Sequence, residues 1–306
     1  MIANARVQAT SGKFRQIDGP TWLVAVAVYA SWFLLVWFHA RLAWWAIVPA
    51  GAYITAWHFS LQHEAIHSFR GAPRWLRSAI VFAPLGLWFP FPLYRESHHT
   101  HHRDADLTVP GIDTESYYVR HADWQRMGVI ERALLIVNQT LAGRLAIGPL
   151  LRLRTLISKE LRRLRLGDRS HLPQWGVHAL AVAGLFWFIS GVCTFPWWQY
   201  VLLVAYPGMS LSLLRAFTEH RAAPGYPERT AVVESNVVFG LLFLYNNLHA
   251  VHHSAPAMPW YEIPRHYRRH RTQVLESNGN FVFTGYGELA RKYLVVPVFS
   301  PVHPTL

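Results

Sequence analysis

The stretch Tyr94-Arg-Glu-Ser-His-His-Thr-His-His102 decides the architecture of this chain, because four of its nine residues are histidine. Two further clusters share this composition. His63-Glu-Ala-Ile-His67 precedes the stretch, and His249-Ala-Val-His-His253 follows it at a long distance. Neutral histidine is a common metal ligand through either ring nitrogen. Three such clusters in one chain predict a polyhistidine metal site.

The spacing inside each cluster is helical, so its histidines share one face of a helix. Residues at i and i+4 are neighbours on a helix surface, as are residues at i and i+3. The second and third clusters both follow H-x-x-H-H, and one more histidine follows the last long apolar run. The candidate ligands are His63, His67, His98, His101, His102, His220, His249, His252 and His253. A tetrahedral zinc takes four ligands, so this number predicts two metal ions. Imidazole suits iron, copper, zinc and nickel alike.

The composition indicates a membrane protein. Of the 306 residues, 52% are hydrophobic and 15% are charged, and 14 are tryptophan; soluble domains carry roughly 25% charged residues. The formal charge of +12 fits either a nucleic-acid ligand or the excess of Lys and Arg on the cytoplasmic side of membrane proteins. The long uncharged runs favour the membrane, so we expect no nucleic-acid partner.

Four apolar runs are each about as long as a bilayer crossing, which needs roughly 20 residues. They cover residues 20–39, 43–62, 175–193 and 197–214, with breaks at 39–41 and 194–196 that predict two helical hairpins. Residues 64–171 carry 16 of the 29 Lys and Arg, which predicts that this segment is cytoplasmic. We therefore expect one all-α integral membrane domain over residues 1–306. It has four crossings, both termini inside, and a cytosolic helical cap that holds the histidines.

Three other segments carry structural expectations. Ser78 to Tyr94 is apolar but contains three prolines, which break helices, so we expect it to dip into the interface without crossing. Arg152 to Arg169 alternates Leu and Ile with basic residues. This pattern fits an amphipathic helix on an anionic membrane surface or a solvated basic helix packed on the protein. Val232 to Leu248 is predicted to be a helix embedded beside the third histidine cluster.

The single cysteine, Cys193, limits the redox chemistry of the chain. Iron–sulfur and rubredoxin-type centres need four cysteines, so any electron donor must be a separate protein.

The order H-x-x-x-H, H-x-x-H-H, H-x-x-H-H around two apolar hairpins resembles the integral-membrane fatty acid desaturase and hydroxylase superfamily. The residues after each box strengthen the resemblance. His101-His-Arg-Asp-Ala-Asp106, with Asp113 and Glu115 beyond it, is similar to the acidic stretch that follows the second box of that family. His252-His-Ser-Ala-Pro-Ala-Met-Pro-Trp-Tyr261 is similar to the segment that follows the third box. The resemblance covers residues 20–275.

The resemblance implies a di-iron centre that uses O2 and two electrons per turnover on a lipid or fatty acyl chain. The nine histidines above become its ligands, in boxes 63–67, 98–102 and 249–253 and at His220. The electron donor would be of the ferredoxin, rubredoxin or cytochrome b5 type. Acyl-CoA desaturases of the family carry Asn where this chain has Ala216, which argues against an acyl-CoA substrate. Acidic side chains that could accept the ligands' second N–H are Glu64, Asp104, Asp106 and Glu219.

Alternatives remain open at this level. Hydroxylation, or ketolation of a carotenoid-type substrate, would use the same ligands as desaturation. His63-Glu-Ala-Ile-His67 also matches H-E-x-x-H, the zinc metalloprotease motif whose Glu is the general base, but an intramembrane protease leaves the other two clusters unexplained. A metal transporter would place ionisable groups at mid-membrane, where these runs hold almost none.

Overall fold

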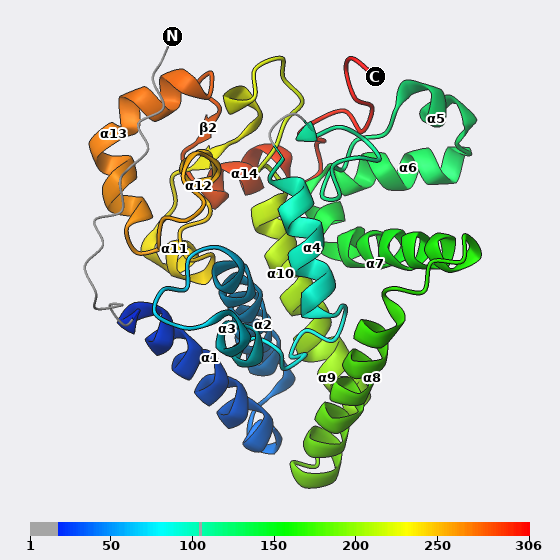
Figure 1. The fold of residues 1–306 in the computed structure, drawn as a ribbon, viewed down its shortest axis with the longest axis vertical. Helices are drawn as coiled ribbons and strands as arrows, with labels where there is room; N and C mark the ends of the chain where they lie inside the picture. Colours follow the sequence, from blue (N-terminus) through cyan, green and yellow to red (C-terminus); the bar gives the residue numbers. More distant parts are fainter. Residues whose placement is uncertain (1–17, 104–105) are drawn as a thin grey trace.

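The computed structural model describes residues 18–103 and 106–306. It is mostly helical, as predicted. Helices α1, α2, α8 and α9 extend toward one end of the molecule, and α12, α13 and α14 gather at the opposite end (Figure 1).

The first hairpin joins α1 (Gly19–Trp37) to α2 (Trp44–His67) through a turn that contains the short helix η1 (His39–Arg41), where the sequence predicted the break. The carboxylate of Asp18 caps α1 by accepting a hydrogen bond from the backbone nitrogen of Thr21 at 3.3 Å. Its other oxygen accepts from the backbone nitrogen of Arg70 at 3.2 Å. This residue therefore fixes the start of α1 beside the segment that follows α2.

The second hairpin begins with α8 (Leu172–Phe186), which continues as the π-helical segment η3 (Trp187–Val192). After the turn at residues 193–196, α9 (Trp197–Tyr200), the π-helical η4 (Val201–Ala205) and α10 (Tyr206–Ala216) form one continuous rod. This rod packs along α2. The two helices approach closely at Gly208, where a Cβ atom would lie 2.3 Å from Cβ of Thr55.

Two helices in the described part of the chain are long and apolar enough to cross a bilayer. They are Gly19–Trp37 and Leu172–Val192, and the bent pair Val129–Asn138 and Leu141–Arg165 adds a third candidate if it counts as one span. The protein therefore has the apolar helices of a membrane protein. The other two predicted crossings form helices at the expected positions, but α2 is largely buried against α1 and α10 and carries polar residues. A count of four crossings remains a prediction.

The segment between the hairpins contains α3 (Arg74–Ile80), α4 (Phe91–His101), α5 (His121–Arg126), α6 (Val129–Asn138) and α7 (Leu141–Arg165). The proline-containing stretch 78–94 forms no long helix: α3 ends at Ile80, an irregular turn follows, and α4 begins at Phe91. Helix α7 is longer than the basic segment predicted from the sequence. The Thr140 hydroxyl caps it by accepting from the backbone nitrogen of Gly143 at 3.0 Å.

The C-terminal region contains η5 (Pro227–Arg229), α11 (Val237–Leu242), α12 (His249–Ser254), α13 (Ile263–Ser277) and α14 (Tyr286–Tyr293). Strands β1 (Val232–Val233) and β2 (Val282–Phe283) pair in parallel, with Val232 opposite Val282. The prediction of a helix over 232–248 was therefore wrong for most of its length. The β-branched residues at its start pair as a strand, and left-handed backbone at Leu244 and Tyr245 prevents α11 from continuing.

Candidate metal centre

Each histidine cluster lies on a short helical surface that turns it toward the same point. His63 and His67 occupy the last turn of α2, one above the other, with ring centroids 5.0 Å apart. His98 and His101 lie at the end of α4, and His102 follows as its C-terminal cap. His99 lies between them in sequence but is exposed, because its position on the helix faces the opposite way.

The third cluster occupies α12, a helix of six residues. Its apolar residues Ala250 and Val251 pack into a core with Ile263 and Tyr267 of α13. The helix therefore turns its three histidines, which are all buried, to its other side. His220 joins them from the segment after α10, where an isolated bridge pairs it with Thr230.

The nine histidines form two groups, and within each group one ligand atom of every residue lies within 4.8 Å of the others. The larger group draws on all three clusters. The smaller one combines His220 with the second and third clusters. The members are His63, His67, His98, His102 and His252 in the five-histidine group, and His101, His220, His249 and His253 in the four-histidine group.

The groups share no residue, yet they share helices. Successive residues on a helix point about 100° apart, so His101 and His102 project into different groups, as do His252 and His253. The Nε2 atoms face one another within each group: His102 to His252 at 3.1 Å, and His220 to His249 at 3.0 Å. The H-x-x-H-H spacing thus directs histidines of one helix into both groups.

The Nδ1 atoms of several of these histidines contact oxygen atoms on the outer side of the groups. Glu115 lies 3.0 Å from Nδ1 of His98, and Asp113 lies 2.8 Å from Nδ1 of His101. Nδ1 of His249 lies 3.1 Å from the Asn246 side-chain oxygen and 3.3 Å from Glu219. An acceptor at Nδ1 favours the tautomer whose Nε2 is free to bind a metal.

Two further contacts involve neutral groups. The Tyr226 hydroxyl lies 3.0 Å from Nδ1 of His253. The side-chain nitrogen of Asn246 lies 3.2 Å from Nε2 of His63, so this buried amide lies between one histidine of each group. Leu244 and Tyr245, in left-handed backbone at φ of 47° and 54°, lead directly into it. Such conformations are costly for residues other than glycine and cluster at functional sites.

The acidic residues expected beside the ligands have different surroundings. Glu219 lies 3.3 Å from Nδ1 of His249, but this carboxylate oxygen makes no hydrogen bond in the described part of the chain. Glu64 instead accepts hydrogen bonds from the Ser68 hydroxyl and from the backbone nitrogen of Trp260, and Asp106 makes no hydrogen bond or ion pair with a histidine of the described chain. Asp104 lies outside the described residues. The carboxylates that contact His98 and His101 are Glu115 and Asp113, which the sequence had indicated only as part of the acidic stretch after the second cluster.

Burial and mutual repulsion keep most of these histidines neutral. Desolvation lowers the pKa of His220 to about 3. Desolvation and neighbouring histidines hold the pKa values of His249, His252 and His253 well below their usual range. Burial also acts to lower the pKa of His101, but Glu115 and Asp113 outweigh it and raise that pKa. Neutral imidazole is the form that binds metals.

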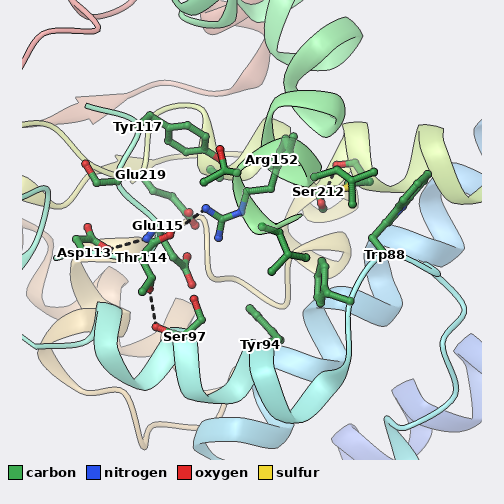
Figure 2. A pocket seen from close by; sticks show the side chains of 18 of the residues that line it. Trp88, Tyr94, Ser97, Asp113, Thr114, Glu115, Tyr117, Arg152, Ser212 and Glu219 are labelled. Carbon is green, nitrogen blue, oxygen red and sulfur yellow. Dashed lines mark hydrogen bonds between the residues drawn. The ribbon is translucent and has the colours of Figure 1, made fainter. Parts of the chain in front are cut away.

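A cavity of about 300 Å³ lies beside the four-histidine group. Helices α4, α7 and α10 surround it (Figure 2). One part is polar and is lined by Glu115, Arg152, Glu219 and His220. Most of the lining surface is apolar and includes Phe59, Trp88, Leu93, Met209 and Leu213, but further charged residues, among them Glu96, Lys159, Glu160 and Arg163, also line the cavity. Of the nine histidines, His220 lies in the lining of this cavity, so a molecule bound there would contact the four-histidine group at that residue.

The comparisons with known proteins agree with this geometry. No curated protein sequence matches the chain. The family model described as fatty acid desaturase matches residues 40–285, a range that contains all nine histidines and most of the chain. The chain therefore belongs to the fatty acid desaturase family.

Proposed function

We propose that this protein is a membrane-bound, non-haem di-iron oxidoreductase that uses O2 to desaturate a lipid or fatty acyl chain. The observation that carries the proposal is the convergence of nine histidines into two adjacent groups beside a largely apolar cavity. The family supports an oxidoreductase with a lipid substrate. Iron, and the formation of a double bond, are our own assignment.

The donor set fits two metal ions. The Nε2 atoms of His67 and His253 are buried and have no hydrogen-bond partner in the described part of the chain. A buried polar atom without a partner costs about 1–3 kcal/mol. One cation bound in each group would give each of these two nitrogen atoms a partner. The five-histidine group would hold one ion and the four-histidine group the other. When bound, the two ions would supply O2 activation and two-electron oxidation of a C–H bond.

Residues of the chain itself would position the histidine ligands and the substrate. Glu115 and Asp113 hold His98 and His101 by Nδ1, and Asn246 holds His249. The apolar part of the cavity would bind the substrate chain and exclude water from the carbons next to the metal groups. Desaturation removes two hydrogens from the substrate and reduces O2 to two waters with two electrons and two protons from outside.

The external electrons require a partner. Cys193 is the one cysteine of the chain and is buried, so a four-cysteine centre is excluded. We propose a separate donor of the ferredoxin, rubredoxin or cytochrome b5 type. We also propose that the metal centre and both termini face the cytoplasm.

The metalloprotease alternative receives no support from the surroundings of Glu64. A general base must face the substrate, but the hydrogen bonds of this carboxylate run to Ser68 and Trp260. Glu64 does not line the described cavity beside the histidines.

The test is the metal content of the purified protein followed by lipid analysis. We expect about two irons per chain, and new double bonds in the lipids of cells that express the protein. New hydroxyl or keto groups in place of double bonds would assign the hydroxylase or ketolase activity to the same centre. One zinc per chain without iron, together with hydrolysis of a peptide, would contradict the proposal.

A further inference from the structure

We propose that α7 binds the anionic headgroups of a phospholipid leaflet, with its axis in the plane of the membrane surface. This inference concerns the face of α7 that points away from the cavity, and it does not depend on the reaction proposed above. The sequence left two environments open for this basic helix, a lipid surface or water. Three features of the structure distinguish them.

The first feature is an exposed apolar stripe. Leu150, Ile157, Leu161 and Leu164 recur at helical spacing along one face of α7 and are each between 42% and 55% exposed. A helix that lay in water would leave this stripe solvated. The neighbouring α6 also exposes apolar side chains, with Val129 and Ile130 the most exposed. An apolar face bordered by basic residues is typical of a helix in the membrane interface.

The second feature is the continuity of α7 with a candidate membrane span. Helix α7 ends at Arg165, and the apolar helix that runs from Leu172 to Val192 begins a few residues later. The C-terminal end of α7 must therefore lie close to the level at which that span enters the bilayer. Figure 1 shows α7 running roughly across the direction of α8, as a helix on the membrane surface would.

The third feature is a set of cations at this end of α7. Arg162, Arg165 and Arg169 are exposed and form no ion pair with a carboxylate in the described part of the chain. Arginine binds phosphate groups through several donors at once, and anionic leaflets attract basic residues close to a membrane span.

Helix α13 provides an internal comparison. It is also basic, with exposed residues Arg265, Arg268 and Arg269. However, this fully described helix exposes no large apolar side chain, and it lies at the end of the molecule opposite the tips of the hairpins (Figure 1). Both helices therefore expose basic residues, but of the two only α7 also exposes an apolar stripe.

The opposite face of α7 gives the inference a functional consequence. Arg152, Leu156 and Lys159 line the cavity beside the metal groups. Binding of α7 to headgroups would therefore set the depth of the cavity relative to the lipid chains.

The test uses the full chain reconstituted in phosphatidylcholine bilayers with trace spin-labelled phosphatidylglycerol or phosphatidylcholine. We expect phosphatidylglycerol to be immobilised preferentially, and salt to weaken this preference. In the triple variant R162Q/R165Q/R169Q, the preference for phosphatidylglycerol over phosphatidylcholine should fall by a factor of up to about five for each arginine removed. The matched variant R265Q/R268Q/R269Q on α13 should keep it. Equal loss in both variants, or no preference in the native chain, would overturn the inference.

A second measurement reports depth and requires neither iron nor turnover. Nitroxides are placed at L161C or at Q273C, an exposed position of α13, in a C193S background. We expect the label on α7 to collide mainly with O2 dissolved in lipid and the label on α13 with a water-soluble nickel chelate. If α7 instead binds an acidic protein, both labels will be accessible to the chelate, and the inference fails.

Discussion

At the scale of single residues, the site depends on which histidines point inward. His99 and His101 are two residues apart on α4, yet one is exposed and the other is buried in the four-histidine group. The direction of the side chain on the helix, and not the presence of histidine, separates the two.

These two histidines provide a matched pair of variants. His101→Ala should remove a ligand, lower the iron content well below two per chain and abolish activity, whereas His99→Ala should keep both. Metal analysis of the two purified proteins checks this. Full iron in the His101 variant would contradict the assignment of that residue as a ligand.

The nine candidate histidines could be selected from the sequence because their spacing is local, and the structure gathers them into two groups. The residues that contact them were predicted less well. Glu64 was expected beside the ligands since it follows His63, yet adjacent residues on a helix point in different directions, and it contacts Ser68 and Trp260. Asn246 reaches His63 and His249 only because left-handed backbone precedes it. No local pattern predicts that turn, and the contact of Tyr226 with His253 likewise depends on tertiary packing.

At the scale of elements, α2 carries the first histidine cluster, and its packing against α10 determines where that cluster lies. Small residues permit this packing, as is common between membrane helices. Gly208 faces Thr55 across the contact. Both helices could be predicted from the sequence, but this contact could not. Gly176 and Gly184 of α8 also lie in an apolar run, yet they have open space around them, so a glycine in such a run does not by itself indicate a helix contact.

Gly208→Ala should therefore destabilise the protein by about 1–3 kcal/mol, since the new methyl group would overlap Thr55. Gly184→Ala on α8 is the control, because a Cβ there meets no atom within 4 Å. Thermal unfolding in detergent measures both. Equal melting temperatures would show that the α2–α10 contact does not require glycine.

Helix α12 makes the stability of the metal-free protein depend on pH. The pKa values of its three histidines lie far below 6.5 in the folded chain. Below about pH 6.5 the unfolded chain binds protons that the folded chain does not, so stability falls as the pH falls and levels off above that value. Each histidine contributes about 1.4 kcal/mol per pH unit. The raised pKa values of His101, Glu64 and Glu219 oppose this trend. They are outnumbered, because the pKa values of five further histidines are lowered as well: His63, His67, His98, His102 and His220.

Denaturant unfolding of the metal-free protein at pH 8 and pH 5.5 tests this dependence. We expect clearly lower stability at the acidic pH. Bound metal should raise the stability at both pH values, but it should not remove the difference, because metal and protons compete for the same ring nitrogens. A metal-free protein equally stable at both values would show that these histidines are not held neutral.

At the scale of the whole molecule, the two hairpins determine the topology. Two or four crossings place both termini on the same side of the membrane, and three place them on opposite sides. The C-terminus lies at the end of the molecule opposite the tip of the second hairpin (Figure 1). The positions of both turns agree with the prediction from the sequence. By length and composition, however, two or three spans are supported. Helix α2 is not among them, because it packs inside the protein and carries polar residues.

The proposed orientation, with both termini in the cytoplasm, predicts that a reporter fused after Leu306 reports the cytoplasm. A second reporter inserted at Ala40, in the turn of the first hairpin, should report the opposite side. An external signal from the C-terminal fusion would contradict the topology of four crossings with both termini inside.

The division of the histidines between the two groups also determines when the protein can mature. Each group needs a residue of α12, whereas the first cluster is synthesised when less than a quarter of the chain exists. More than half of the chain separates His67 from His249. Neither centre can be complete while the ribosome is still making the intervening helices. The proposed metal loading would therefore be a late event in biogenesis, and a chain released before α12 could insert its hairpins but would never complete either group.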